Sequence, residues 1–373
     1  MKILLVEPDF PIPAKSKNHA SFLPVGLLKL ATYYRKQNHE VHLNRGNFES
    51  PFVPDKILVT SLFTYWAEYV KATVTYYRSK YPQARIIVGG IYASLMPQHC
   101  KEYTGCNTVF VGQHKSADLL YPAYDLVNVD YQILHGMRGC TRKCPFCGIW
   151  KLEKLTFKDH TKIRKEILAN KLIFYDNNIL VNPFIESILE MISNLRINNK
   201  IVHCECQSGF DGREIDKKPY LPKLLKAARF KNIRLAWDFN YEQFSQVEKW
   251  INIFEEAGYR RSEISIFMIY NWSFDFIELE QKRIKCFEWG VQISDCRFRP
   301  LNQTFDNYNG RLDHQGEEAY YIHSNWTDSQ IRQFRKNVRT HNICIRHRLQ
   351  MNEYSRDREK KRPIQNFSYI TQK

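Results

Sequence analysis

The sequence predicts an α/β protein in which a doubly wound parallel sheet is followed by a partial (β/α)6 TIM-like barrel. Three observations over the 373 residues lead to this prediction. Short apolar runs that end in polar or glycine-rich turns are typical of buried parallel strands. Between these runs, apolar residues recur at helical spacing, so strands and helices alternate. The alternation stops over residues 116–131 and then resumes, which divides the chain into two parts.

Residues 1–115 are expected to form the doubly wound, Rossmann-like domain. Its predicted strands are residues 2–6, 40–43, 57–61, 86–90 and 108–112, and its predicted helices are residues 25–38 and 65–81. A sheet of this kind binds its ligand at the carboxyl ends of the strands. The loops at residues 7–17, 61–64 and 89–95 are therefore the candidate ligand site of this domain.

Residues 116–131 are a predicted linker, and residues 132–301 are the predicted barrel. Its six strands are expected at residues 132–137, 172–176, 201–206, 232–237, 263–269 and 291–296. The helices between them are expected at residues 159–170, 183–197, 218–229, 241–258 and 274–289. Barrel enzymes carry their catalytic residues on the loops that follow the strands, so we expect the site there.

The remaining residues, 302–373, are predicted to be a basic helical extension with a helix at residues 327–340. Together with a formal net charge of +16, this extension suggests a large or anionic substrate, such as RNA, DNA, a peptide or a phosphorylated metabolite. The alternative is that the basic residues serve solubility, because no recognised nucleic-acid-binding module occurs.

The composition argues against a membrane protein and against a secreted one. No run of about 18 apolar residues occurs, and the first residues lack the pattern of a signal peptide. We therefore expect no membrane insertion and a cytoplasmic location. The ten cysteines are scattered along the chain, which favours reduced thiols over a disulfide framework.

One group of cysteines has the spacing of metal ligands. Cys140, Cys144 and Cys147 follow a C-x3-C-x2-C pattern on a glycine-flanked loop directly after the first predicted barrel strand. Three thiolates on one loop can bind three irons of a 4Fe-4S cluster and leave the fourth iron open. The alternative is a zinc site with a fourth ligand such as His135, although structural zinc usually draws on two separated ligand pairs.

This motif, including the aromatic Phe146 before its last cysteine, resembles that of the radical S-adenosylmethionine (SAM) superfamily. The resemblance implies that the open iron binds SAM. An electron from the cluster then cleaves SAM to methionine and a 5'-deoxyadenosyl radical. It also implies an external electron donor of the flavodoxin or ferredoxin type.

The resemblance extends to segments that follow later strands. The segment at residues 174–178 resembles the one that meets the SAM amino group, and the segment at 207–211 resembles the one near its carboxylate and ribose. Turns, helix caps and surface arginines are the ordinary explanations for the same residues. The residues expected to bind SAM are Asp176, Asn177, Asn178, Gln207, Gly209, Asp238, Arg283 and Arg297.

The first domain resembles the cobalamin-binding domain of one radical SAM branch. The resemblance assigns cobalamin to Ser61, Leu62, Gly89 and Gly90. The D-x-H-x-x-G segment that supplies an axial histidine does not occur, so the alternative is a Rossmann-like domain without cobalamin. A methylthiotransferase is disfavoured, because it needs a second set of three cysteines and residues 1–115 contain only two.

The sequence thus predicts a radical SAM enzyme that transfers a methyl group from cobalamin to an unactivated carbon. One alternative is a cobalamin-free radical SAM enzyme that performs a rearrangement, cyclisation or oxidation. The other is a nucleic-acid-binding protein with a structural metal site.

Overall fold

The computed structural model describes residues 1–12 and 22–350, which form two compact units. Unit 1 comprises residues 1–233 and 298–322, and unit 2 comprises residues 234–297 and the chain from 323 onward. The predicted α/β class is confirmed. No helix in the described part of the chain is long and apolar enough to cross a membrane. Residues 13–17 of the predicted loop at 7–17 and the basic arm beyond residue 350 lie outside the described residues.

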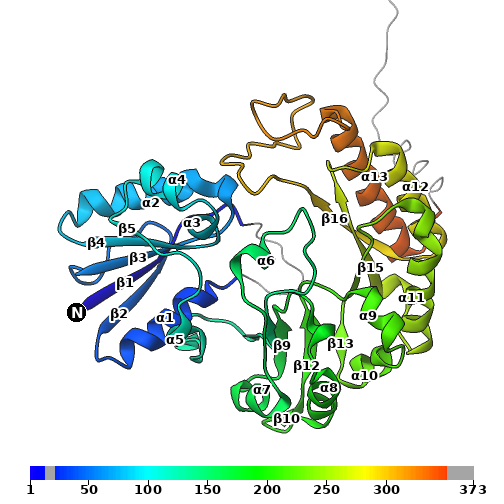
Figure 1. Cartoon of the computed structure of the whole chain (residues 1–373), viewed down its shortest axis with the longest axis horizontal. Coiled ribbons are helices and arrows are strands. Elements are labelled where there is room, and N and C mark those ends of the chain that lie inside the picture. The colour runs from blue at the N-terminus through cyan, green and yellow to red at the C-terminus, as the bar shows by residue number, and fades with distance from the viewer. Residues whose placement is uncertain (13–21, 351–373) are drawn as a thin grey trace, which may run out of the picture. The chain divides into compact units, whose positions relative to one another are not determined.

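Unit 1 begins with a five-stranded parallel sheet of order β2-β1-β3-β4-β5. Its strands are β1 (Lys2–Glu7), β2 (Glu40–Arg45), β3 (Lys56–Ser61), β4 (Arg85–Gly90) and β5 (Thr108–Val109). One face carries α1 (Val25–Arg35) and α5 (Lys115–Asp118), and the other carries α2 (Ala67–Lys80), α3 (Ile91–Leu95) and α4 (Pro97–Thr104) (Figure 1). This strand order is a doubly wound one.

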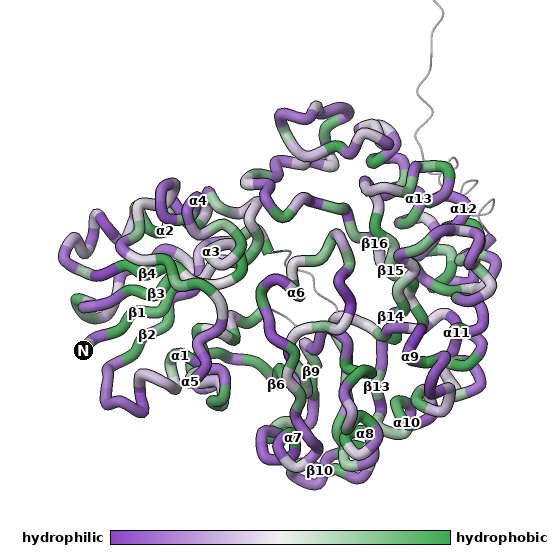
Figure 2. Tube along the Cα trace, in the orientation of Figure 1, coloured by the Kyte–Doolittle hydropathy of each residue, from purple (hydrophilic) through white to green (hydrophobic). Residues whose placement is uncertain are grey.

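Successive side chains of β1 enter cores on opposite faces of this sheet. Figure 2 shows the hydropathy of the residues along the sheet. Leu4 and Val6 belong to the buried cluster that includes Val70 of α2. Their neighbours Ile3 and Leu5 belong to the cluster on the α1 side. A strand buried on both faces needs apolar residues at consecutive positions, and β1 is such a run.

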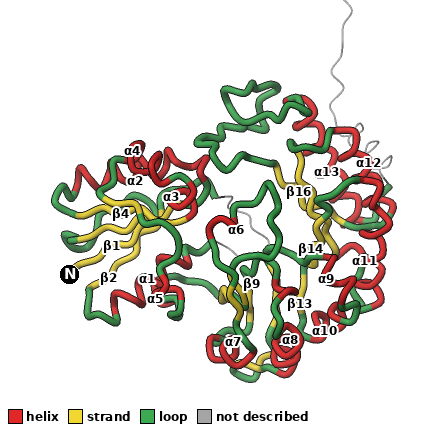
Figure 3. The backbone as a smooth tube through the Cα atoms, viewed as in Figure 1, coloured by secondary structure: helices red, strands yellow, loops and turns green. Residues whose placement is uncertain are grey.

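A second parallel sheet of unit 1 has the order β13-β12-β9-β6. Its strands are β6 (Gln132–Leu134), β9 (Lys171–Phe174), β12 (His203–Cys206) and β13 (Phe230–Lys231). The helices that accompany it are α7 (His160–Glu166), α8 (Ile185–Asn194), α9 (Gly212–Lys217) and α10 (Leu221–Ala227) (Figure 3). A small hairpin, β10 (Arg196–Ile197) with β11 (Lys200–Ile201), follows α8.

The predicted first barrel strand, residues 132–137, is shorter in the structure. β6 ends at Leu134, and the chain then forms β7 (Met137–Arg138), which pairs antiparallel with β8 (Thr156–Phe157). The cysteines lie between β7 and β8, followed by α6 (Ile149–Leu152). The motif is therefore held at both ends by a two-stranded ladder, which the sequence pattern did not predict.

Unit 2 contains the strands β14 (Ile233–Ala236), β15 (Ile264–Tyr270) and β16 (Gln292–Arg297) in the order β14-β15-β16. Its helices are α11 (Phe244–Glu256), α12 (Phe276–Glu288) and α13 (Asp328–His347). The six predicted barrel strands thus occur as three in each unit, while their closure into one barrel stays a prediction.

Helix α13 is longer than the predicted helix at 327–340. Thr327 and Gln330 form a capping box at its start. A buried stripe along the helix, which packs against α12 and β16, extends as far as Cys344. Because the stripe continues beyond residue 340, the helix continues with it.

We predict that Gly90→Ala lowers the free energy of unfolding by roughly 2–4 kcal/mol. Gly90 has a φ of 105°, and an added Cβ would overlap the Ser61 carbonyl oxygen. Gly26→Ala is the matched control, since an added Cβ there meets nothing within 4 Å. The control should gain about 0.5–1 kcal/mol in urea unfolding. Equal effects of the two substitutions would contradict this account.

Candidate functional site

The three cysteines of the motif lie on the loop between β7 and β8. The backbone N–H of Cys147 donates to the Cys144 carbonyl over 3.1 Å, so the last two cysteines share one turn. The indole N–H of Trp150 donates to the same carbonyl over 3.2 Å. The three cysteines are in no disulfide, and they and Phe146 are part-exposed.

Backbone N–H groups approach two of these sulfurs. The N–H of Arg142 donates to Cys140 Sγ over 3.4 Å. Burial raises the pKa of the Cys147 thiol, and the nearby Cys140 and Glu153 raise it further, while a hydrogen bond from the Ile149 backbone lowers it. Hydrogen bonds from N–H groups favour the thiolate form, which is the form that binds metal.

Within residues 1–12 and 22–350, no three His, Cys, Asp or Glu side chains are grouped as ligands of a single metal ion. A mononuclear zinc site needs its ligands grouped around one ion, at about 2.0–2.3 Å from it. In a cuboidal cluster the thiolates need not surround a single ion, since each thiolate binds its own iron atom. The three thiols, with N–H groups near two of the sulfurs, are donors of the chemical type that an iron-sulfur cluster uses.

The carboxylate of Asp176 holds the start of the cysteine loop. Its two oxygens accept the backbone N–H groups of Gly136 over 3.0 Å and Met137 over 2.6 Å. Asn182 adds a hydrogen bond to the Gly136 carbonyl over 2.9 Å. The Asp176 side chain is 0% exposed, and burial raises its pKa to about 7 against the opposing hydrogen bonds and cations. The loop after β9 is thereby fixed to the chain after β6.

Glu153, at the end of α6, holds the middle of the same loop. One of its oxygens accepts the N–H of Gly139 over 3.0 Å and the Asn177 amide over 3.3 Å. The other pairs with Arg138 over 2.7 Å. Glu153 was not among the predicted site residues, because it lies among lysines in a segment with no periodic pattern.

The loop after β12 joins this group through Asp211. Arg142, on the cysteine loop, contacts Asp211 over 2.7 Å and Glu214 over 3.1 Å. The Asn178 amide donates to the same Asp211 oxygen over 3.1 Å. Burial opposes ionisation of Asp211, yet Arg213 and Arg142 together hold its pKa below the usual value. Three loops, after β6, β9 and β12, therefore form one hydrogen-bonded network.

Two buried acceptors beside this network have no donor within the described residues. They are the side-chain carbonyl oxygens of Asn178 and Gln207. Gln207 is held at its place because its backbone N–H donates to the Phe174 carbonyl at the end of β9. The next turn contains Gly209 with a φ of 77°. An unpaired buried acceptor costs about 1–3 kcal/mol, so a ligand with N–H groups would relieve this cost.

The other three residues expected to bind SAM belong to unit 2. Arg283 pairs with Glu280 of the same helix over 2.9 Å, and Arg297 ends β16 with little exposure. Asp238 lies near the fully buried Lys282, whose pKa is lowered by burial and raised in part by Glu278 and Asp238. The guanidinium of Arg283 thus already has a carboxylate partner on its own helix.

Three of the four residues expected to bind cobalamin, Ser61, Gly89 and Gly90, lie against one another, and Leu62 contacts α3. The Ser61 hydroxyl donates to the Gly89 carbonyl over 2.8 Å and accepts a backbone N–H of α3 over 3.0 Å. The Leu62 carbonyl accepts the Tyr92 N–H over 2.9 Å. The space that a side chain at Gly90 would fill is taken by the Ser61 backbone. These contacts engage the Ser61 hydroxyl and the Leu62 carbonyl within the domain itself, and cobalamin binding stays a prediction.

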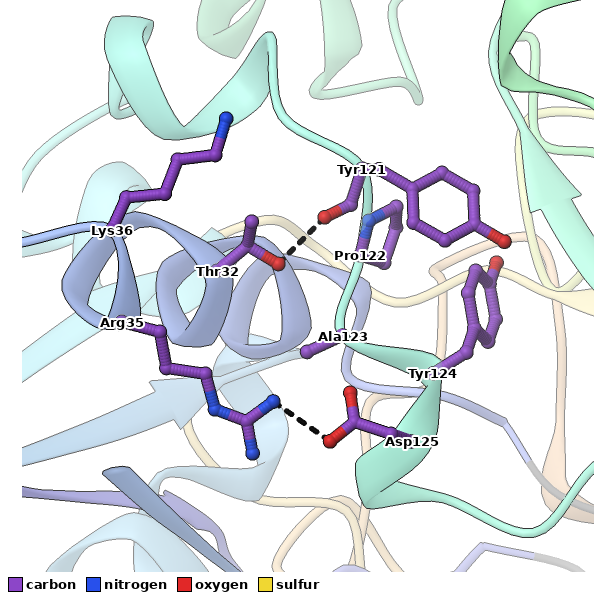
Figure 4. A pocket seen from close by; sticks show the side chains of 8 residues that line it. All are labelled: Thr32, Arg35, Lys36, Tyr121, Pro122, Ala123, Tyr124 and Asp125. Atoms are coloured by element: carbon purple, nitrogen blue, oxygen red, sulfur yellow. Dashed lines mark hydrogen bonds and ion pairs between the residues drawn. The ribbon is translucent and has the colours of Figure 1, made fainter. Parts of the chain in front are cut away.

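A pocket of about 450 Å³ lies elsewhere in unit 1, between α1 and residues 121–125 (Figure 4). Its walls are joined by a hydrogen bond from Thr32 to the Tyr121 carbonyl and by an ion pair of Arg35 with Asp125, each 2.7 Å. None of the residues predicted to bind a cofactor lines it. We assign no chemistry to this pocket.

In comparisons with known proteins, the chain matches no protein-family model and no curated protein.

We predict that Asp176 makes the protein less stable as pH rises from about 4 to 7. Its carboxyl has a raised pKa in the folded state, so the folded protein binds the proton more tightly than the unfolded chain does. Its contribution is fully present below the unfolded pKa and is lost towards pH 7. The Asp176→Asn variant lacks this titration.

Urea unfolding at pH 4.5, 5.5 and 6.5 measures the effect. The stability of the wild type should fall relative to the Asn variant by about 1.4 kcal/mol per pH unit. Parallel pH profiles of the two proteins would show that Asp176 titrates normally.

Proposed function

We propose that this protein is a radical SAM enzyme in which Cys140, Cys144 and Cys147 hold a 4Fe-4S cluster. The observation that carries the proposal is the network joining the cysteine loop to the loops after β9 and β12. Asp176 and Arg142 make the two connections. Neighbouring parallel strands bring their carboxyl ends to one edge of a sheet, where α/β enzymes have their active sites.

The two unpaired acceptors support SAM as the ligand. Asn178 Oδ1 and Gln207 Oε1 can accept N–H groups, and SAM has an amino group. Both residues lie in the segments that the family resemblance assigned to SAM. A positively charged donor would gain more from these oxygens than a neutral one.

When bound, a cluster with one open iron supplies the electron that cleaves SAM to methionine and a 5'-deoxyadenosyl radical. The protein's residues provide the positioning. Asp176 and Glu153 hold the backbone of the cysteine loop, and the Arg142–Asp211 pair fixes the distance between that loop and the chain after β12. The Asn178 oxygen would accept the amino group of SAM, and the Gln207 oxygen would accept a further donor of the ligand, such as a ribose hydroxyl. An external flavodoxin- or ferredoxin-type donor is part of this proposal.

The contacts among Ser61, Gly89 and Gly90 favour the cobalamin-free form of the proposal. These residues pack β3 against β4. This packing is sufficient to explain why serine and glycine occur at these positions, without a bound cofactor. Methyl transfer from cobalamin stays a prediction of the resemblance, and no step of the mechanism above depends on it.

We predict that reconstituted wild-type protein forms 5'-deoxyadenosine and that Cys140→Ala, Cys144→Ala and Cys147→Ala variants do not. The protein is loaded anaerobically with iron and sulfide, then incubated with dithionite and SAM, and the product is measured by chromatography. Cys296→Ser is the control, because Cys296 is exposed and lies outside the motif. A wild-type protein with a loaded cluster but no product, or with zinc at the site, would overturn the proposal. The nucleic-acid-binding alternative, with its steep salt dependence, would then be pursued.

We predict that Gln207→Met weakens SAM binding by about tenfold or more, because a hydrogen bond to a charged group is removed. The ligand-free variant should be as stable as the wild type or more stable, since an unpaired buried oxygen is lost. Ser208→Ala, at the exposed neighbouring position, is the control. Anaerobic calorimetric titration measures affinity, and urea unfolding measures stability. A destabilised variant with unchanged affinity would assign Gln207 a structural role.

A further inference from the structure

Helix α13 has a line of arginines along one face. Arg332, Arg335, Arg339 and Arg346 follow one another at intervals of three, four and seven residues, which places them on the same side of an α-helix. The last three are exposed, whereas Arg332 is only part-exposed. At a rise of about 1.5 Å per residue, these three extend along about 16 Å of the helix axis. Together they form the arginine stripe.

The acids beside the arginine stripe are too few to neutralise it. Asp328, in the first turn of α13, is buried and pairs with Arg332 over 2.7 Å. Asp295 of β16 lies near the first two arginines of the stripe, whose charges lower its pKa although burial raises it more. Arg346 donates to the Asn342 carbonyl over 3.0 Å and has no ion pair within the described residues. The stripe therefore keeps an excess of positive charge.

The apolar side of α13 is used within its own unit. Ile331, Phe334 and Val338 are buried on the side that packs against α12 and β16 (Figure 1). A basic helix that lies on a membrane inserts its apolar side between the lipids, and on α13 that side is covered. The helix dipole explains a cation in the last turn, such as Arg346, but not the two arginines in the middle of the helix. The stripe thus suits a hydrophilic, anionic partner.

We propose that the arginine stripe binds the phosphate backbone of a nucleic acid. A guanidinium group can donate two parallel hydrogen bonds to one phosphate, and it stays charged at every physiological pH. One strand of a DNA duplex has a phosphate about every 3.4 Å, so about five phosphates fall within the length of the stripe. The formal net charge of +16 favours the approach of such a polyanion. The inference goes beyond the proposed function and does not depend on it.

Fluorescence anisotropy of labelled probes measures this binding. Single-stranded RNA, single-stranded DNA and duplex DNA, each of about 20 nucleotides per strand, are titrated with the full-length protein between about 50 and 300 mM salt. The wild type should bind with an affinity that falls steeply with salt, and the tightest probe identifies the kind of nucleic acid. No SAM is present, so a failure of the proposed function leaves this result unchanged.

A triple variant tests the stripe itself. In Arg335→Gln, Arg339→Gln, Arg346→Gln the affinity at about 0.1 M salt should fall about tenfold or more. The slope of log affinity against log salt for duplex DNA should become shallower by about 2–3, because each neutralised phosphate contributes about 0.9. Glutamine is a good helix former, and urea unfolding checks that the variant is folded. The charges beyond residue 350 are the same in both proteins, so the difference reports α13.

A second triple variant, Lys200→Gln, Lys223→Gln, Lys231→Gln, is the control. It removes the same charge from exposed positions on three separate elements, and it should keep the wild-type slope. Absence of binding by the wild type, or equal losses in the two triple variants, would overturn the inference. Polyglutamate that binds as tightly as the nucleic acids would also overturn it and would assign the arginine stripe to an acidic protein.

Discussion

The hydrogen bonds from Gly136 and Met137 to the buried carboxylate of Asp176 are the interaction on which the candidate site depends. β9 pairs with β6 on one side and β12 on the other, so its following loop is the natural anchor for both neighbours. Through Asp176 it fixes the entry of the cysteine loop, and through Asn178 it reaches Asp211. The carboxylate is costly to bury, and the two N–H groups offset part of that cost.

The charges around the cysteines are balanced within the protein. Arg138 pairs with Glu153, and Arg142 pairs with Asp211 and Glu214. These arginines therefore act as connectors between loops. The groups that face two of the sulfurs are backbone N–H donors, which carry partial charges at fixed positions and need no counter-ion.

Strands and helices with a continuous apolar pattern were predictable to within a few residues, as β3 and β15 illustrate. β13 was not predicted, because a strand of two residues is too short to show an apolar pattern. The chain reverses just before it at Arg229, whose φ of 58° is unusual for a residue with a side chain and has no signal in the sequence. The spacing of the cysteines was sufficient to predict the cysteine loop as the candidate site. Glu153 and Asn182 were not predicted, because they contact this loop through hydrogen bonds between residues that are distant in sequence. Glycines 89 and 90 do mark a close backbone approach, but a sequence does not tell whether a ligand or a neighbouring strand makes it.

The division of the chain into units has a consequence for the order of synthesis. During synthesis, β16 of unit 2 is made first. Residues 298–322, which belong to unit 1, are made next, and α13 of unit 2 is made after them. α13 covers β16 and α12 with Ile331, Phe334 and Val338. A ribosome-bound chain that has emerged only as far as residue 322 therefore displays a sheet with a bare apolar side, and such surfaces aggregate or recruit chaperones. Synthesis of α13 ends this exposure.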